Sequence, residues 1–119
     1  MPYLFVAIMS LLLTYPAFAK GKITPCAIRN GRSLARELNR LPLNDKHKHC
    51  TLTCVVTLEC SAGAARSLGL AKEILDLLGL GNADAADLEA NERGIQTARS
   101  GRARDKRECL EQCGNDYET

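Results

Sequence analysis

Six cysteines, two pairs of which share one spacing, constrain this chain more than any other feature of its sequence. Cys50 and Cys54 are four residues apart, as are Cys109 and Cys113. On a helix, two residues at this spacing lie on one face, one turn apart. Their Cβ vectors do not point at each other, so we expect each pair to bond across a helix interface to the other pair.

The relative direction of these two helices decides which cysteines join. Each bridge would add about 2 to 4 kcal/mol to the free energy of unfolding. If the helices run antiparallel, the expected bridges are Cys50 to Cys113 and Cys54 to Cys109, and Cys26 is left to join Cys60.

A predicted signal peptide precedes all six cysteines. Residues 1–14 are mostly apolar, and residues 15–19 read Tyr-Pro-Ala-Phe-Ala, which ends in the small-x-small pattern of a cleavage site. We expect cleavage after Ala19, and a retained anchor is the alternative. A membrane span needs about 20 apolar residues, more than this stretch has. The mature protein is therefore expected to be secreted or periplasmic, where disulfides persist.

Zinc is the alternative use of the cysteines, because His47 and His49 stand beside Cys50 and the two pairs offer four thiolates. Export favours oxidation, and zinc sites usually have closer cysteine spacing. We therefore predict no metal and no other cofactor.

Composition limits the core and the partners. After cleavage Tyr117 is the only aromatic residue, and Leu, Ile and Val make up roughly a fifth of the mature chain, so a thin aliphatic core depends on the disulfides. The net charge of +2 and the lack of aromatic stacking platforms argue against nucleic-acid binding. Membrane contact is not expected after signal cleavage, because acidic residues interrupt the basic ones in the last helix.

Apolar residues recur at helical spacing in most of the mature chain. Ser61 and Asp84 are expected helix caps, and Pro42 is expected to end the first helix. Residues 46–60 are rich in β-branched residues, so a strand is the alternative there, but the cysteine spacing favours a helix. We expect helices over 33–41, 46–60, 61–78, 84–101 and 102–113.

These elements predict an all-α, disulfide-stapled bundle of four to five short helices in a single domain. The expected organisation is a signal peptide over 1–19, an extended segment over 20–32, the helical domain over 33–113 and a flexible tail over 114–119.

Polar residues on three of the expected helices form a candidate site. Asp87, Asn91 and Gly94 share one stripe of the fourth helix, next to its apolar positions. With His49 on the second helix and Glu73 on the third, they could form an acid/base or metal cluster. The structural alternative is that Asp87 caps its helix, Asn91 bonds a loop carbonyl and Gly94 permits close packing.

The same residues carry a resemblance over roughly residues 47 to 99. The pattern resembles an uncharacterised bacterial helical domain of secreted and RHS-repeat-associated proteins, and this resemblance implies that His49, Glu73, Asp87, Asn91 and Gly94 are the site residues. Lys72 stands where that domain has its second His, and the aromatic residue after the first His is missing. The pattern is His49-Cys50-x-x-x-Cys54, Lys72-Glu73 and Asp87-x-x-x-Asn91-x-x-Gly94.

Two functions follow as hypotheses. The first is an exported protein that binds a protein partner in the periplasm or extracellular space, which the mixed-charge surface and the absent second His favour. The second is a small secreted hydrolase or toxin-like effector that uses His49 with Glu73 or Asp87, with or without a metal, and with Asn91 as a further site residue.

Overall fold

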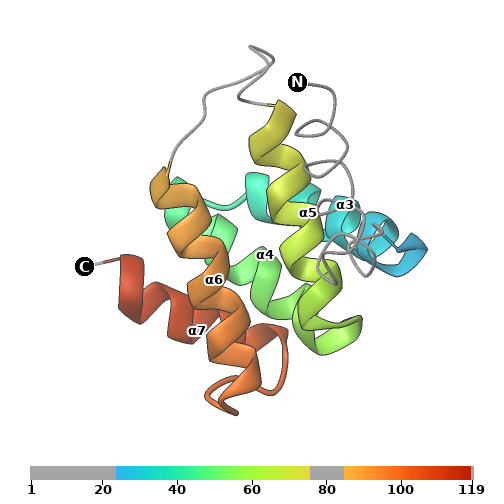
Figure 1. The fold of residues 1–119 in the computed structure, drawn as a ribbon. Helices are drawn as coiled ribbons and strands as arrows, with labels where there is room; N and C mark the ends of the chain where they lie inside the picture. The colour runs from blue at the N-terminus through green and yellow to red at the C-terminus, as the bar shows by residue number, and fades with distance from the viewer. Residues whose placement is uncertain (1–23, 76–84, 119) are drawn as a thin grey trace, which may run out of the picture.

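Five helices make up the part of the chain that the computed structural model describes, residues 24–75 and 85–118 (Figure 1). These residues contain no strand, and for residues 70–75 only the backbone is described. The predicted all-α, disulfide-stapled bundle is confirmed, and the strand alternative for residues 46–60 is wrong. In chain order the helices are α3 (Pro25–Asn39), α4 (Asp45–Glu59), α5 (Ala62–Leu75), α6 (Ala85–Arg99) and α7 (Lys106–Tyr117).

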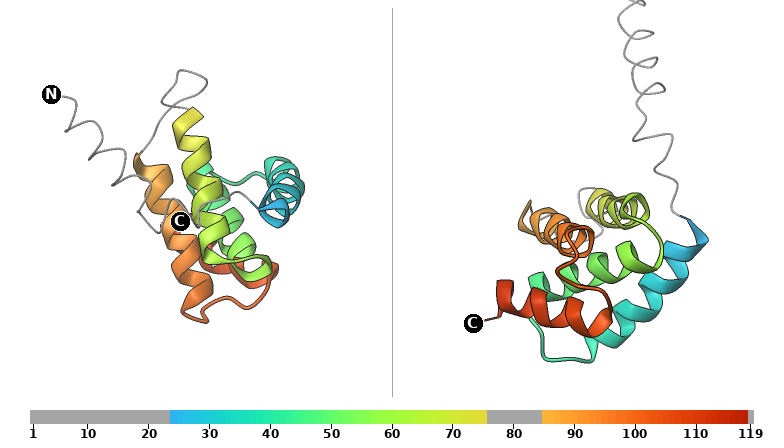
Figure 2. Two further views of the ribbon diagram at one scale, coloured as in Figure 1. Left: turned by 45° about the vertical axis from the view of Figure 1, so that its right-hand side comes forward. Right: turned by 90° about the horizontal axis from the view of Figure 1, so that it is seen from below.

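Helix α4 is the centre of the bundle and packs against each of the other four described helices. Figure 2 shows α5 and α6 next to each other on one side of α4, with α3 and α7 on the other side. Because α4 has neighbours on both sides, polar as well as apolar side chains are buried, and the buried polar ones need partners. Its buried residues are His47, His49, Cys50, Thr51, Thr53, Cys54, Val55 and Val56.

Two clusters of small and aliphatic side chains form the core, as the composition predicts. The first joins Leu34 and Leu38 of α3 to Val55 of α4 and to the four cysteines of α4 and α7. The second joins Val56 of α4 to Ile95 of α6 and to alanines of α3 and α5. With no aromatic side chain in either set of buried residues, the sulfur atoms supply much of the buried volume.

Side-chain caps explain where four of the helices begin. The hydroxyl of Thr24 accepts from the amide of Ala27, and that of Ser61 from the amide of Ala64, as expected for Ser61. Asn44 caps α4, and Asp105 caps α7 by accepting from the amide of Glu108. The expected cap at Asp84 lies outside the described residues.

The extended segment expected over residues 20–32 is wrong from Pro25 onward, because α3 begins there. Proline suits the first turn of a helix, where its missing N–H would have no helical partner. Ala27 and Gly31 continue the buried stripe of Leu34 and Leu38 by two further turns. The buried face of α3 therefore begins two turns earlier than the 33–41 segment predicts.

The flexible tail expected over residues 114–119 is wrong as far as Tyr117, because α7 continues to that residue. The amide of Asn44 donates to Oε1 of Glu118 at 2.6 Å, and the side-chain amide of Asn44 donates to the carbonyl of Tyr117 at 2.7 Å. His47 Nδ1 lies 3.3 Å from the same Glu118 oxygen. These contacts join the end of α7 to the start of α4.

The disulfides are the three expected for antiparallel helices: Cys50–Cys113, Cys54–Cys109 and Cys26–Cys60. The first two join α4 to α7, with Cα–Cα distances of 5.7 and 5.9 Å. All six cysteines are bonded, so zinc binding by thiolates is excluded. Three disulfides indicate an oxidising environment.

The expected signal peptide, residues 1–19, lies outside the described residues. None of the helices within residues 24–75 and 85–118 has the combination of length and apolarity that crossing a bilayer requires.

Removing both α4–α7 disulfides together should lower the free energy of unfolding by more than the sum of the losses from removing each one alone. While one remains, the other closes a ring of only about ten residues, worth about 2 to 3 kcal/mol of unfolding free energy. The last one closes a loop of 55 or 63 residues, worth about 4 kcal/mol. We expect the fourfold alanine variant to lose more stability in denaturant unfolding than the two double variants together. If the fourfold variant loses no more stability than that sum, the ring-closure explanation is wrong.

The Glu118 contact should make stability depend on pH. The hydrogen bond from the Asn44 backbone and the nearby His47 hold the pKa of Glu118 below its ordinary value of 4.5. The Glu118 carboxylate therefore stabilises the fold when the pH is above its ordinary pKa of 4.5. This stabilisation is lost as the pH falls through the lowered pKa of the folded state. We expect Glu118→Gln to be less stable than the native protein at pH 7 and to approach it at pH 3. Glu89→Gln, at an exposed position on α6, is the control.

Candidate functional site

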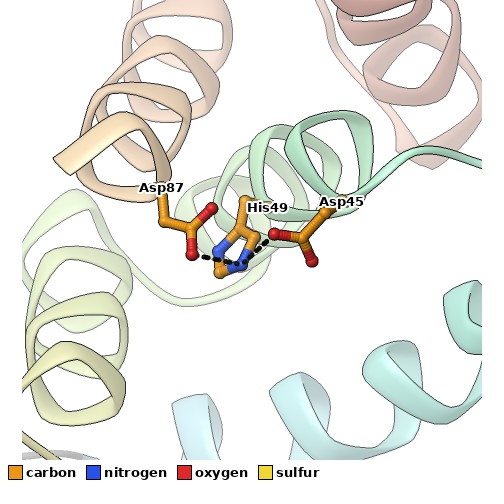
Figure 3. Close-up of side chains that lie close together, drawn as sticks. All are labelled: Asp45, His49 and Asp87. Carbon is orange, nitrogen blue, oxygen red and sulfur yellow. Dashed lines mark ion pairs between the residues drawn. The ribbon is translucent and has the colours of Figure 1, made fainter. Parts of the chain in front are cut away.

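Three side chains from two helices meet in one cluster: Asp45 and His49 of α4 and Asp87 of α6 (Figure 3). Asp45 and His49 share a face of α4, since they are four residues apart. Nε2 of His49 lies 3.6 Å from Oδ2 of Asp45 and 3.5 Å from Oδ2 of Asp87. The side chains of His49 and Asp87 are 8% and 5% exposed, whereas that of Asp45 is 68% exposed. The cluster is thus closed toward α6 and open at Asp45.

Asn91 sets the direction of the imidazole ring. It lies one turn after Asp87 on the same face of α6, and its Oδ1 is 3.0 Å from Nδ1 of His49. With Nδ1 donating to this oxygen, Nε2 faces the two carboxylates. The Nδ2 atom of Asn91 is buried and has no hydrogen-bond partner among the described residues.

Lys46 supplies the positive charge nearest to the carboxylates. Its ammonium group donates to Oδ1 of Asp87 and lies 3.6 Å from Oδ2 of Asp45. Burial is the largest single effect on the pKa of Asp45 and raises it. A hydrogen bond with Asp87 and the charges of His49 and Lys46 together outweigh burial, so the pKa of Asp45 is lower than its ordinary 3.8. Asp45 is therefore ionised at neutral pH.

Two adjoining pockets, each of about 170 Å³, open beside His49. Both are lined by His49 and Leu52 of α4 and by Ala35 of α3. The first also reaches Asp45 and Lys48, and the second extends to Asn91 and Gly69. A small molecule in either pocket would contact the imidazole.

The structure brings together three of the four predicted catalytic residues: His49, Asp87 and Asn91. The side chain of Glu73 is not among those described. Asp45 and Lys46 were missed, although Asp45 stands four residues before His49 at the start of the same helix. That spacing was a detectable signal, whereas the contact of Lys46 with Asp87 depends on how α6 packs.

No protein-family model, curated protein or solved structure matches this chain. The resemblance to a bacterial domain of secreted and RHS-repeat-associated proteins stays a prediction. Any function must therefore be argued from the geometry and chemistry of the site.

Close approach of α6 to α4 is what allows Asp87 and Asn91 to reach His49. A Cβ atom on Gly94 would lie 2.1 Å from the carbonyl oxygen of Cys50 and 2.2 Å from Oγ1 of Thr53. The Thr53 hydroxyl in turn donates to the carbonyl of Asn91 at 2.8 Å. Gly94 thus permits close packing, as one sequence interpretation held, and through that packing it places the site residues.

Gly94→Ala should push α6 away from α4. Because the clash involves backbone atoms, we expect a loss of about 3 kcal/mol in the free energy of unfolding, the upper end of the usual cost of overpacking. Gly63→Ala is the matched control on α5, where the nearest atom would be 4.0 Å away, and we expect it to gain about 0.5 to 1 kcal/mol. Similar stabilities of the two variants in urea unfolding would show that α6 does not need this contact.

Proposed function

We propose that this protein is a small exported hydrolase, in which the cluster of Asp45, His49 and Asp87 holds and activates a water molecule. The proposal rests on the position of three side chains that meet beside a pocket: His49 of α4, and Asp87 and Asn91 of α6. Burying a histidine, a carboxylate and an amide in a 119-residue chain with a thin core costs stability. Buried ionisable groups beside a pocket are typical of functional sites.

The geometry supports water activation in two ways. Nε2 of His49 and the two Oδ2 atoms converge on one point, so a water there would have acceptors for both of its protons. Asn91 fixes the ring through Nδ1, and Lys46 offsets the charge of Asp87, so the acceptors are held in place before a substrate arrives. The pockets beside His49 would hold the scissile group next to that water.

The test is hydrolysis of a panel of nitrophenyl carboxylic and phosphoric esters and nitroanilide peptides by the processed, oxidised protein. We expect the native protein to cleave at least one class. His49→Gln and Asp87→Asn should each lower that rate by on the order of 100-fold or more, as for loss of an acid/base group.

His47→Gln is the matched control for this experiment. His47 lies on the same helix and is similarly buried, but its Nε2 donates to the carbonyl of Leu110, away from the cluster. Thermal unfolding should show that all three variants are folded. If His49→Gln is as active as His47→Gln, the hydrolase proposal fails.

Binding of a protein partner remains the second candidate. In the part of the chain that the structure describes, four large apolar side chains are 38 to 41% exposed: Ile28, Leu41, Leu58 and Leu88. If the processed protein binds a partner with equal affinity in its native and His49→Gln forms and hydrolyses nothing, this function is favoured instead.

A further inference from the structure

We infer that Asp45, His49 and Asp87 form a binding site for one divalent transition-metal ion of the zinc or manganese class. The proposal rests on the hydrolase function and refines it: the ion would lie where the three atoms converge, and the activated water would be bound to the ion on its open side instead of to these atoms directly. Three protein ligands with an open side are the usual protein contribution to a catalytic zinc site.

The distances from Nε2 of His49 to the two carboxylate oxygens are those of ligands on one ion. Bonds of about 2.0 to 2.2 Å in tetrahedral geometry place ligand atoms about 3.3 to 3.6 Å apart. Nε2 of His49 is 3.5 Å from Oδ2 of Asp87 and 3.6 Å from Oδ2 of Asp45, and all three atoms lie within 4.8 Å of one another. Direct N–H···O hydrogen bonds would be shorter, at about 2.7 to 3.2 Å.

The orientation of His49 is also that of a metal ligand. A ligating histidine usually donates its second ring N–H to an oxygen acceptor, which fixes the tautomer. Asn91 Oδ1 provides this acceptor at 3.0 Å from Nδ1. The lone pair on Nε2 then faces two carboxylates, an arrangement that a bound cation would stabilise.

The charges leave room for a divalent ion. Among the described side chains of the cluster, two carboxylates face one ammonium group. Lys46 contacts Oδ1 of Asp87, whereas the ligand atom there is Oδ2, and its ammonium lies 3.6 Å from Oδ2 of Asp45. Asp45 is exposed and lines the first pocket, so an ion can enter and water can complete its coordination. One imidazole and two carboxylates favour zinc or manganese over calcium, which takes oxygen ligands.

The direct experiment is calorimetric titration of the oxidised, EDTA-treated native protein with Zn²⁺, and separately with Co²⁺ to follow its visible absorption. We expect one ion per chain, with a Co²⁺ spectrum typical of a nitrogen and oxygen ligand set. His49→Gln and Asp87→Asn should abolish this binding, and Asn91→Ala should weaken it by about 10-fold to 100-fold.

Two further variants make the test specific. Lys46→Met removes a positive charge 3.6 Å from Oδ2 of Asp45, so it should tighten metal binding. His47→Gln, which removes the other buried histidine of α4, should leave binding unchanged. Absence of stoichiometric binding at millimolar Zn²⁺ and Co²⁺, or binding equal in the native and His49→Gln proteins, would overturn the inference.

Failure of this inference can be told apart from failure of the hydrolase proposal. Hydrolysis that persists in EDTA and still requires His49 would overturn the metal site and leave the hydrolase. Stoichiometric binding that requires His49, without hydrolysis of any substrate class, would support the metal site and count against the hydrolase.

Discussion

The two disulfides between α4 and α7 are the constraint on which the rest of the structure depends. They hold α4 against α7 on one side, and the aliphatic clusters then pack α3, α5 and α6 around it. A chain with so few large apolar side chains gains little from burial alone. The covalent links limit the unfolded state, and the buried sulfur atoms also fill part of the core.

Because α4 has neighbours on both sides, some of its polar side chains are buried and need partners within the bundle. His47 and His49 are both buried in α4, but they meet different surroundings. His47 binds the carbonyl of Leu110 and lies beside Glu118, so it helps to join the chain end to the bundle. His49 faces Asp87 and Asn91, which α6 brings close through Gly94. The same burial therefore produces one structural histidine and one candidate functional histidine.

The predictability of this protein from sequence differs from element to element. The disulfide pairing could be derived for antiparallel helices, because helical geometry leaves few ways to join two pairs at a four-residue spacing, but the direction of the helices was left open. The start of α3 was missed because Pro25 and Cys26 were interpreted as an extended segment, although Thr24-Pro25 is also a good helix start. His49, Asp87 and Asn91 could be selected from polar residues near apolar stripes. Asp45 was overlooked because the predicted helix began one residue later, at residue 46, whereas α4 begins at Asp45.

Local sequence by itself determined the helical class, most helix positions and the cysteine pairs that had to face each other, because these depend on spacing along one or two helices. Only the tertiary structure decided that α4 lies at the centre, that Lys46 contacts Asp87, and that His49 points into a carboxylate pair. These features depend on how closely α6 approaches α4. The two helices can approach closely because Gly94 has no side chain and so leaves room for backbone atoms of α4. The spacing of residues within one helix does not specify which atoms of another helix it will contact.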